Sequence, residues 1–138
     1  MACPAVFHGE ELVGYDLIDL RRYTRRPLAR ILAPKDGTSS RGRLRFDAAA
    51  IHVGTRAILS AVQAELDMVV IDEVGPLEFR GEGWASALRV ALRDCATRQK
   101  LLIVVRAGLA DQLPIRFPSE LWATADSVSP PWPAMTMA

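Results

Sequence analysis

Two unbroken apolar runs constrain the fold of this 138-residue chain more than any other feature of its sequence. Residues 68–71 and 101–105 carry only apolar side chains, and strands that are apolar on both faces belong to parallel sheets covered by helices. Between the runs, over roughly 82–97, apolar residues recur at the spacing of one helical face; they are Trp84, Leu88, Ala91, Leu92 and Cys95. This order of strand, helix and strand predicts a right-handed βαβ unit.

The segments on either side predict a mixed α/β domain. Short apolar or alternating stretches, separated by turn residues, predict a meander of antiparallel strands over 4–8, 12–20 and 27–32. The stretch 33–42 has loop chemistry, and 43–46 predicts a further short strand. After the βαβ unit we expect a short helix at about 108–113 and an edge strand at 121–128.

Asp47 predicts the start of an amphipathic helix over roughly 48–65. Its carboxylate can accept hydrogen bonds from the free amides of the first turn, and apolar side chains then recur at helical spacing. Gly54 interrupts this pattern. A glycine inside a helix costs about 1 kcal/mol relative to alanine, so we interpret Gly54 as a site of close packing.

The composition is that of a soluble globular protein, and we expect a cytoplasmic location. Half of the residues are hydrophobic and 24% are charged, which is ordinary for one buried core. No apolar stretch reaches the length of a membrane span, and no signal-peptide pattern is present. Cys3 and Cys95 are too few for a disulfide framework or a four-ligand zinc site. We expect Cys95 in the core and Cys3 as an exposed thiol.

Positive charge is concentrated in one segment. Residues 21–45 carry nine basic side chains against one acid, Asp36, and so hold a net charge of +8 in a chain whose total is +1. One interpretation is a basic face for phosphates or nucleic acid. The other, which we favour, is a solvated surface of hairpins and loops.

The segment 69–78, Val-Val-Ile-Asp-Glu-Val-Gly-Pro-Leu-Glu, carries the clearest chemistry. An apolar strand that ends in Asp-Glu is the Walker B pattern, and the strand ends at the sheet edge where α/β proteins bind ligands. There Asp72 can hold Mg²⁺ through a water, and Glu73 can polarise a water for attack on a γ-phosphate. Gly75 and Pro76 turn the chain, which keeps Glu78 near the same edge. The alternative is that Asp72 and Glu73 only end a strand and cap a loop.

The longer string Ile-Asp-Glu-Val-Gly-Pro-Leu-Glu over 71–78 resembles a known family. It is similar to the Walker B segment of the nucleoside-triphosphatase family of P-loop NTPases, known from thermophiles and present in animals as the cancer-related NTPase. The Gly-Tyr strand at 14–20, the Pro-Leu-Ala-Arg strand at 26–30 and the Phe-Asp helix start at 46–47 resemble further family segments in order. The resemblance covers roughly residues 4–128.

The resemblance implies a P-loop NTPase-like three-layer α/β fold, with a mainly parallel sheet and an N-terminal antiparallel hairpin region. It assigns 1–128 to one domain and leaves 129–138 as an irregular, proline-rich tail. It also implies Mg²⁺-dependent hydrolysis of nucleoside triphosphates such as ATP or GTP to diphosphates. Asp72 matches the metal-organising acid and Glu73 the catalytic acid. Glu78 matches a family position without an assigned role, and Arg106 lies where a residue could approach the γ-phosphate or simply face solvent.

The sequence departs from the family in one respect. Members begin with a strand, a Gly-x-x-Gly-x-Gly-Lys-Ser/Thr loop that cradles the phosphates, and a helix. The only lysines here are Lys35 and Lys100, and neither lies in such a loop. We therefore expect a domain without its first strand, P-loop and first helix, with neighbouring strand edges unpaired. It is either a truncated form, which the intact Asp-Glu pair favours, or a degenerate relative.

This departure leaves two functional alternatives. One is a nucleoside-triphosphate phosphohydrolase that is impaired or inactive in this chain. The other is an inactive remnant of the fold that binds a partner through 21–45. His8 and His52 lie in different predicted elements and are weak candidates for any site. We expect Trp84 in the core, while Trp122 and Trp132 either pack or line a partner surface.

Overall fold

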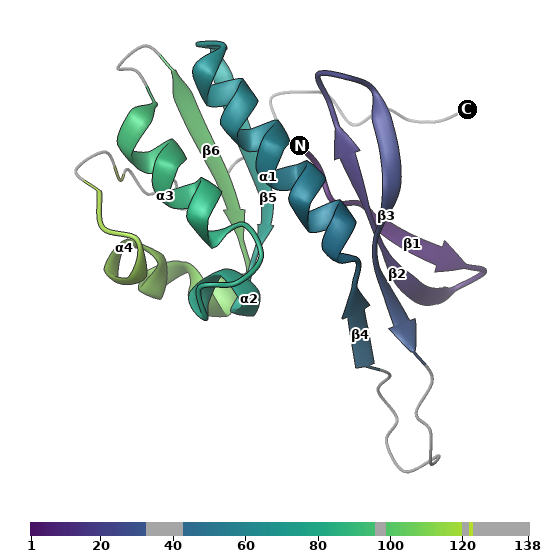
Figure 1. Ribbon diagram of the computed structural model, residues 1–138. Coiled ribbons are helices and arrows are strands. Elements are labelled where there is room, and N and C mark those ends of the chain that lie inside the picture. The colour runs from purple at the N-terminus through teal and green to yellow at the C-terminus, as the bar shows by residue number, and fades with distance from the viewer. Residues whose placement is uncertain (33–42, 96–98, 120–121, 123–138) are drawn as a thin grey trace, which may run out of the picture.

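The computed structural model describes residues 1–32, 43–95, 99–119 and 122. Figure 1 shows an antiparallel sheet beside a parallel pair of strands, with helices along one side. The elements follow in the order β1 (Ala5–His8), β2 (Glu11–Asp19), β3 (Thr24–Leu32), β4 (Arg43–Phe46), α1 (Ala48–Gln63), β5 (Met68–Val74), α2 (Pro76–Phe79), α3 (Ala85–Asp94), β6 (Lys100–Val105), η1 (Ala107–Gln112) and α4 (Leu113–Arg116).

The first four strands form the antiparallel meander that the sequence predicts, in the spatial order β1-β2-β3-β4. The short strand over 43–46 is confirmed as β4, which pairs with β3 and lies at the end of this sheet. The N-cap at Asp47 is also confirmed, because its Oδ1 accepts a hydrogen bond from the amide of Ala49 at 2.9 Å. The cap fixes the point at which β4 gives way to α1.

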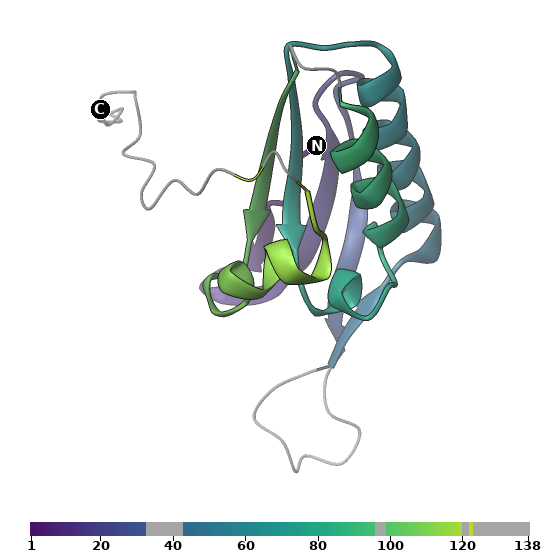
Figure 2. The same ribbon diagram turned by 90° about the vertical axis from the view of Figure 1, so that its left-hand side faces the viewer.

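β5 and β6 pair in parallel with α3 between them in sequence, which confirms the strand–helix–strand unit. Figure 2 shows α1 and α3 along one face of the strands, with α2, η1 and α4 at the end toward which β5 and β6 run. Helix α1 contacts β2, β3 and β5, so it joins the two sheets. This arrangement collects the carboxyl ends of β5 and β6 at one end of the domain.

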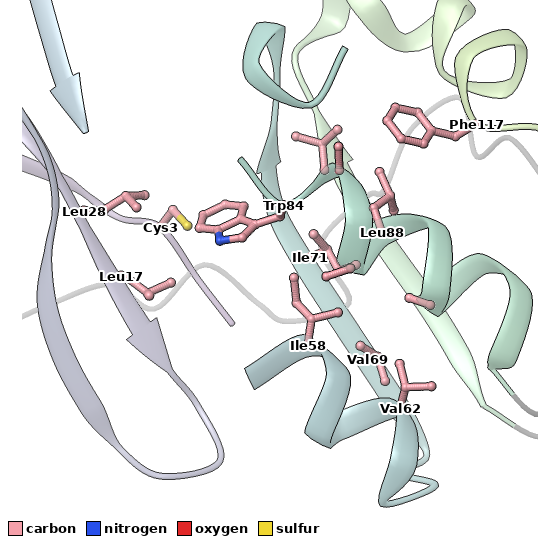
Figure 3. Packing of buried hydrophobic residues seen from close by; sticks show 14 of the residues in the cluster. Cys3, Leu17, Leu28, Ile58, Val62, Val69, Ile71, Trp84, Leu88 and Phe117 are labelled. Atoms are coloured by element: carbon pink, nitrogen blue, oxygen red, sulfur yellow. The ribbon is translucent and has the colours of Figure 1, made fainter. Parts of the chain in front are cut away.

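The core lies between these helices and the strands (Figure 3). Trp84 is 3% exposed, as the sequence predicts, and its indole extends toward Cys3 and Leu28 in this view. The expectation of an exposed Cys3 thiol is wrong, since the side chain is only 3% exposed. A bridge from Ala2 to Ile18 and a hydrogen bond from the Cys3 amide to Asp72 hold this segment between the two sheets.

β6 departs from the expectation of a strand buried on both faces. Leu102 and Val104 are 44% and 43% exposed, and Met68 at the start of β5 is 50% exposed. Burial alternates along β6, and Leu101, Ile103 and Val105 pack against the core, so Leu102 and Val104 lie on the opposite face of the strand. Among the described strands β6 pairs with β5 alone. Parallel pairing is thus limited to two strands, so the described part does not form a mainly parallel sheet.

Several element boundaries also differ from the predictions. The helix expected over 82–97 is shorter, because Trp84 acts as its N-cap and the chain leaves the helix after Asp94. The helix expected near 108–113 is a 3-10 turn, η1, that continues into α4. The predicted strand at 121–128 and the tail 129–138, with Trp132, fall outside the described residues except at Trp122. No helix in the described segments combines the length and apolar character needed to cross a membrane.

Candidate functional site

A β-bulge interrupts β5 at the Asp-Glu pair. Ile71 pairs with Ile103 and Val74 with Val105, so Asp72 and Glu73 together oppose the single residue Val104. Without the extra residue, Glu73 would follow Val69 and Ile71 onto the face that packs in the core. Burying a carboxylate there would be costly. Instead Val74 takes that core position, 1% exposed, and the bulge re-aims Glu73 toward the end of the sheet.

Glu73 has an unusual backbone conformation at this bulge. Its φ is +61°, which lies in the left-handed region that residues with a Cβ rarely adopt. Such a conformation costs on the order of 1–3 kcal/mol and persists only where the surroundings hold it. Strained residues of this kind cluster at functional sites, so the backbone at Glu73 supports a functional assignment independently of the sequence motif.

Three of the four sequence-predicted site residues line one pocket of about 100 Å³: Glu73, Glu78 and Arg106. This is room for several water molecules. The antiparallel sheet, α1 and the loops around α2 complete the wall with Tyr15, Leu28, Leu44, Phe46, Ile51, Gly75, Pro76, Leu77, Gly83 and Trp84. The pocket therefore combines a charged group of side chains with an apolar wall from distant segments.

The surroundings of Glu73 favour its protonated form. Partial burial raises the pKa of the Glu73 carboxyl above its ordinary value, and the charge of Asp72 raises it further, while Arg106 opposes the change. A carboxylate with a raised pKa is a stronger base than an ordinary surface glutamate. Arg106 follows β6 and is itself exposed, and its amide donates to the carbonyl of Val74 at 3.4 Å. It borders the pocket at the side of the Glu73 carboxylate.

Asp72 does not line this pocket. Its Oδ2 accepts a hydrogen bond from the Cys3 amide at 2.7 Å, and its Oδ1 accepts one from the Glu73 amide at 3.0 Å. Each oxygen keeps a second lone pair, so the carboxylate can still receive a metal-bound water. The carboxylate oxygens of Asp72 and Glu73 are of the donor type that Mg²⁺ takes in nucleotide sites. The described residues contain no cluster of three acidic, histidine or cysteine ligands.

Glu78 is enclosed, although it borders the pocket. The residue is 3% exposed, and each of its carboxylate oxygens accepts one backbone hydrogen bond. Glu78 is therefore near Glu73, as the sequence predicts, but it is almost fully buried and both of its oxygens bind backbone amides. It belongs to the wall that supports the site.

Sequence reasoning missed the wall residues Tyr15 and Phe46. Both come from the antiparallel sheet and reach the pocket through pairing of β2 with β3 and β3 with β4. Their aromatic side chains also suit the ordinary apolar positions of a half-buried strand. No local pattern distinguishes such residues from core residues, because their position depends on contacts between distant segments.

Part of the positive charge over 21–45 is neutralised within the sheet. Asp16 accepts hydrogen bonds from Arg25 and Arg30, both at 2.7 Å, and Asp19 pairs with Arg22 at 3.1 Å. Burial opposes ionisation of Asp16, but the two arginines hold its pKa below the ordinary value. These pairs favour the interpretation of the segment as hairpin surface. Its remaining charge includes Lys35 and Arg41, which lie outside the described residues.

The remaining candidates do not converge on the pocket. His8 ends β1 and His52 lies on α1, and both are exposed. Burial, with the nearby charges of Asp72 and Glu73, raises the pKa of the Cys3 thiol to about 12, so it is a poor nucleophile. Cys95 is half-buried rather than fully in the core. Trp122 is half-buried and donates to the carbonyl of Phe117 at 2.9 Å, which favours packing over a partner surface.

Replacing Glu73 with glycine should stabilise the protein. Glycine adopts a φ of +61° without strain, and the substitution also removes a carboxylate that is disfavoured in its ionised form. We expect Glu73→Gly to be more stable than Glu73→Ala by about 1 kcal/mol in urea unfolding, since alanine keeps the left-handed strain. An alanine variant as stable as the glycine variant would show that this backbone is unstrained.

Comparison with known proteins identifies the family of this chain. A family model described as NTPase matches residues 1–118. The chain is 33% identical over 110 residues to the nucleoside-triphosphatase THEP1 of Pyrobaculum aerophilum, an alignment that covers 75% of this chain and 60% of that protein. The chain thus spans about three-fifths of the length of this curated relative. No solved structure matches. The chain belongs to the NTPase family, which confirms the expected resemblance to the nucleoside-triphosphatase family of P-loop NTPases.

Proposed function

We propose that Asp72 and Glu73 form the acidic half of a nucleoside-triphosphate phosphohydrolase site, which converts a triphosphate and water to a diphosphate and phosphate. The observation that carries the proposal is the bulge in β5. Because of the bulge, Glu73 does not occupy a core-facing position of the strand and instead lines a pocket together with Arg106. A strand that only ended in a polar loop would need neither the bulge nor the left-handed residue.

Glu73 is the general base in this proposal. Its raised pKa suits it to take a proton from a water in the pocket as the water oxygen bonds to the γ-phosphorus and the bond to the β-phosphate oxygen breaks. The Arg106 guanidinium would stabilise negative charge on the transferred phosphoryl group. Asp72 would hold Mg²⁺ through a water, and the bound ion would neutralise the β- and γ-phosphate oxygens.

The 138 residues do not contain the Gly-rich, lysine-bearing loop that binds phosphates in this family. Phosphoryl transfer depends mainly on positioning and electrostatic stabilisation, and two carboxylates alone repel a triphosphate. We therefore expect steady-state phosphate release from ATP or GTP by this chain to be at or near background. Any turnover above background should fall by at least about 100-fold in Glu73→Gln, the loss expected for a missing general base.

A second measurement tests the site without turnover. In this experiment Mn²⁺·ATP is added in place of Mg²⁺·ATP, because Mn²⁺ is paramagnetic. The broadening of backbone NMR signals near the ion then shows where the ion lies. We expect broadening of residues 72–75 and 106, lost in Asp72→Asn. The exposed pair Glu10 and Glu11, where the turn after β1 enters β2, is the matched control because it also consists of two acidic residues adjacent in sequence. Equal broadening at both pairs, or none at 72–75, would contradict the proposal.

A further inference from the structure

Glu78 joins two turns of the chain through a single buried carboxylate. Its Oε2 accepts a hydrogen bond from the Gly75 amide at 2.9 Å, and its Oε1 accepts one from the Trp84 amide at 3.0 Å. Gly75 precedes α2, and Trp84 precedes α3. Bonds of this kind to an ionised acceptor are roughly twice as strong as neutral ones. The carboxylate thus fixes the exit of β5 against the start of α3.

The space around this carboxylate is closed. A Cβ added at Gly83 would lie 2.1 Å from Glu78 Oε1, and Gly83 has a φ of +57°, so the position requires glycine for two reasons. Trp84 is anchored on its other side, where its indole Nε1 donates to the Ile51 carbonyl in α1 at 3.1 Å. We call the two hydrogen bonds of Glu78 to the Gly75 and Trp84 amides the Glu78 clamp. Through the Trp84 indole the clamp is anchored to α1, which itself contacts both sheets.

Glu73 lies between two fixed points of the chain. On one side Ile71 pairs with Ile103, and on the other Val74 pairs with Val105 and the Gly75 amide is held by Glu78. A strained residue keeps its conformation only when its surroundings enforce it. With the Gly75 amide released, the segment could relax into a regular strand, and Glu73 would leave the pocket.

We propose that Glu78 is a positioning residue for this site, because its clamp on the Gly75 and Trp84 amides holds Glu73 in the left-handed conformation that directs its carboxylate to the pocket. The importance of Glu73 itself rests on the proposed function, but the clamp and its effect on Glu73 do not. In this proposal Glu78 acts on the backbone around Glu73 and not on the reacting groups, because the residue is 3% exposed and each of its oxygens binds a backbone amide.

The test compares backbone NMR of the full chain, Glu78→Gln and the control Glu82→Gln without any nucleotide. Glutamine has nearly the same size but one acceptor oxygen, so it can satisfy only one of the two amides. Glu82 lies in the same loop, its side chain is 58% exposed, and its carboxylate pairs with Arg80 at 3.4 Å. Amide hydrogen exchange at Gly75 and Trp84 reports the clamp, and the Cα and Cβ chemical shifts of Glu73 report its left-handed backbone.

In Glu78→Gln we expect exchange at Gly75 or Trp84 to accelerate at least about 10-fold beyond any change at Val69 and Ile71, which report global opening. We also expect the Glu73 shifts to lose their left-handed values, whereas Glu82→Gln leaves both readouts unchanged. Unchanged Glu73 shifts in a folded Glu78→Gln protein would overturn the proposal, since a merely structural role lowers stability without altering that conformation.

If Glu78→Gln does not fold, the unmodified protein still tests the clamp. Scalar coupling across the hydrogen bonds, from the Gly75 and Trp84 amide nitrogens to the Glu78 side-chain carboxyl carbon, should be detectable, and its absence at both amides would overturn the proposal. Neither readout involves catalysis. If the chain does not bind Mn²⁺·ATP but the hydrogen bonds of the clamp are detected, the proposed function is contradicted and the positioning of Glu73 by Glu78 is not.

Discussion

Replacing Trp84 with alanine should lower the free energy of unfolding by about 3–5 kcal/mol, the range for truncating a buried tryptophan. The side chain is 3% exposed and packs in the core cluster between α1, α3 and the antiparallel sheet. Its loss leaves a cavity and removes the donor for the Ile51 carbonyl. Urea unfolding followed by far-ultraviolet circular dichroism measures the change.

Trp122→Ala is the matched control for this prediction. Trp122 also donates its indole N–H to a backbone carbonyl, that of Phe117, but it is only half-buried. We expect it to cost about 1–2 kcal/mol, because less apolar surface returns to water. If both alanine variants lost the same free energy of unfolding, the packing of α1 against α3 would not depend on Trp84. If Trp84→Ala is too unstable to measure, Trp84→Leu should give a smaller loss in the same direction.

Replacing Gly54 with alanine should destabilise the protein by about 1–3 kcal/mol, the cost of overpacking a core. This reverses the usual effect, because alanine inside a helix is normally favoured over glycine by about 1 kcal/mol. A Cβ at Gly54 would lie 2.5 Å from Trp84 Nε1 and 2.9 Å from the adjacent ring carbon. The ring is buried and hydrogen-bonded to Ile51, so it cannot move aside without cost.

A double-mutant cycle isolates the cause of this loss. In a Trp84→Leu background the clash is relieved, and Gly54→Ala should become neutral or stabilising by up to about 1 kcal/mol. Gly108→Ala is the external control, since nothing lies within 4 Å of its added Cβ. If Gly54→Ala were equally destabilising with and without the indole, the close approach of α1 to Trp84 would not explain the glycine.

The elements of this fold are predictable from sequence where one local pattern determines them. The apolar runs at 68–71 and 101–105 become paired strands, the Asp47 cap starts α1, and Gly54 marks a close approach. The prediction that both faces of β6 are buried was wrong. An apolar side chain favours burial, but the sequence of the strand does not show whether another segment packs on it. Exposure of Leu102 and Val104 depends on which segments lie beside them, and no local pattern contains that information.

For the candidate site, the sequence proposes residues, which stay a prediction, but it does not predict their geometry. Sequence spacing identified Asp72 and Glu73, but it placed them together at a strand end, whereas the bulge separates their environments. One local signal for the bulge exists. In a regular strand Glu73 would face the core, whereas the next residue, Val74, is apolar and takes the core position once the bulge shifts the alternation. The clamp at Glu78 could not be read in this way, because its partners are backbone amides and the turn back to Trp84 is a tertiary feature.

In the part of the chain that the structure describes, one edge of β6 has no partner strand, and this has a consequence for how the protein behaves in solution. Outward-facing backbone donors and acceptors, flanked by the exposed Leu102 and Val104, form the kind of edge on which a strand from another molecule can add. Lys100, at the start of β6, is the one charged residue of that strand. Its charge is therefore the only one on β6 that opposes the addition of another strand. We therefore expect sedimentation to show reversible self-association that grows with protein concentration. We expect Leu102→Lys to suppress it while leaving the Glu73 pocket intact, because Leu102 pairs with Val70 and not with the bulge.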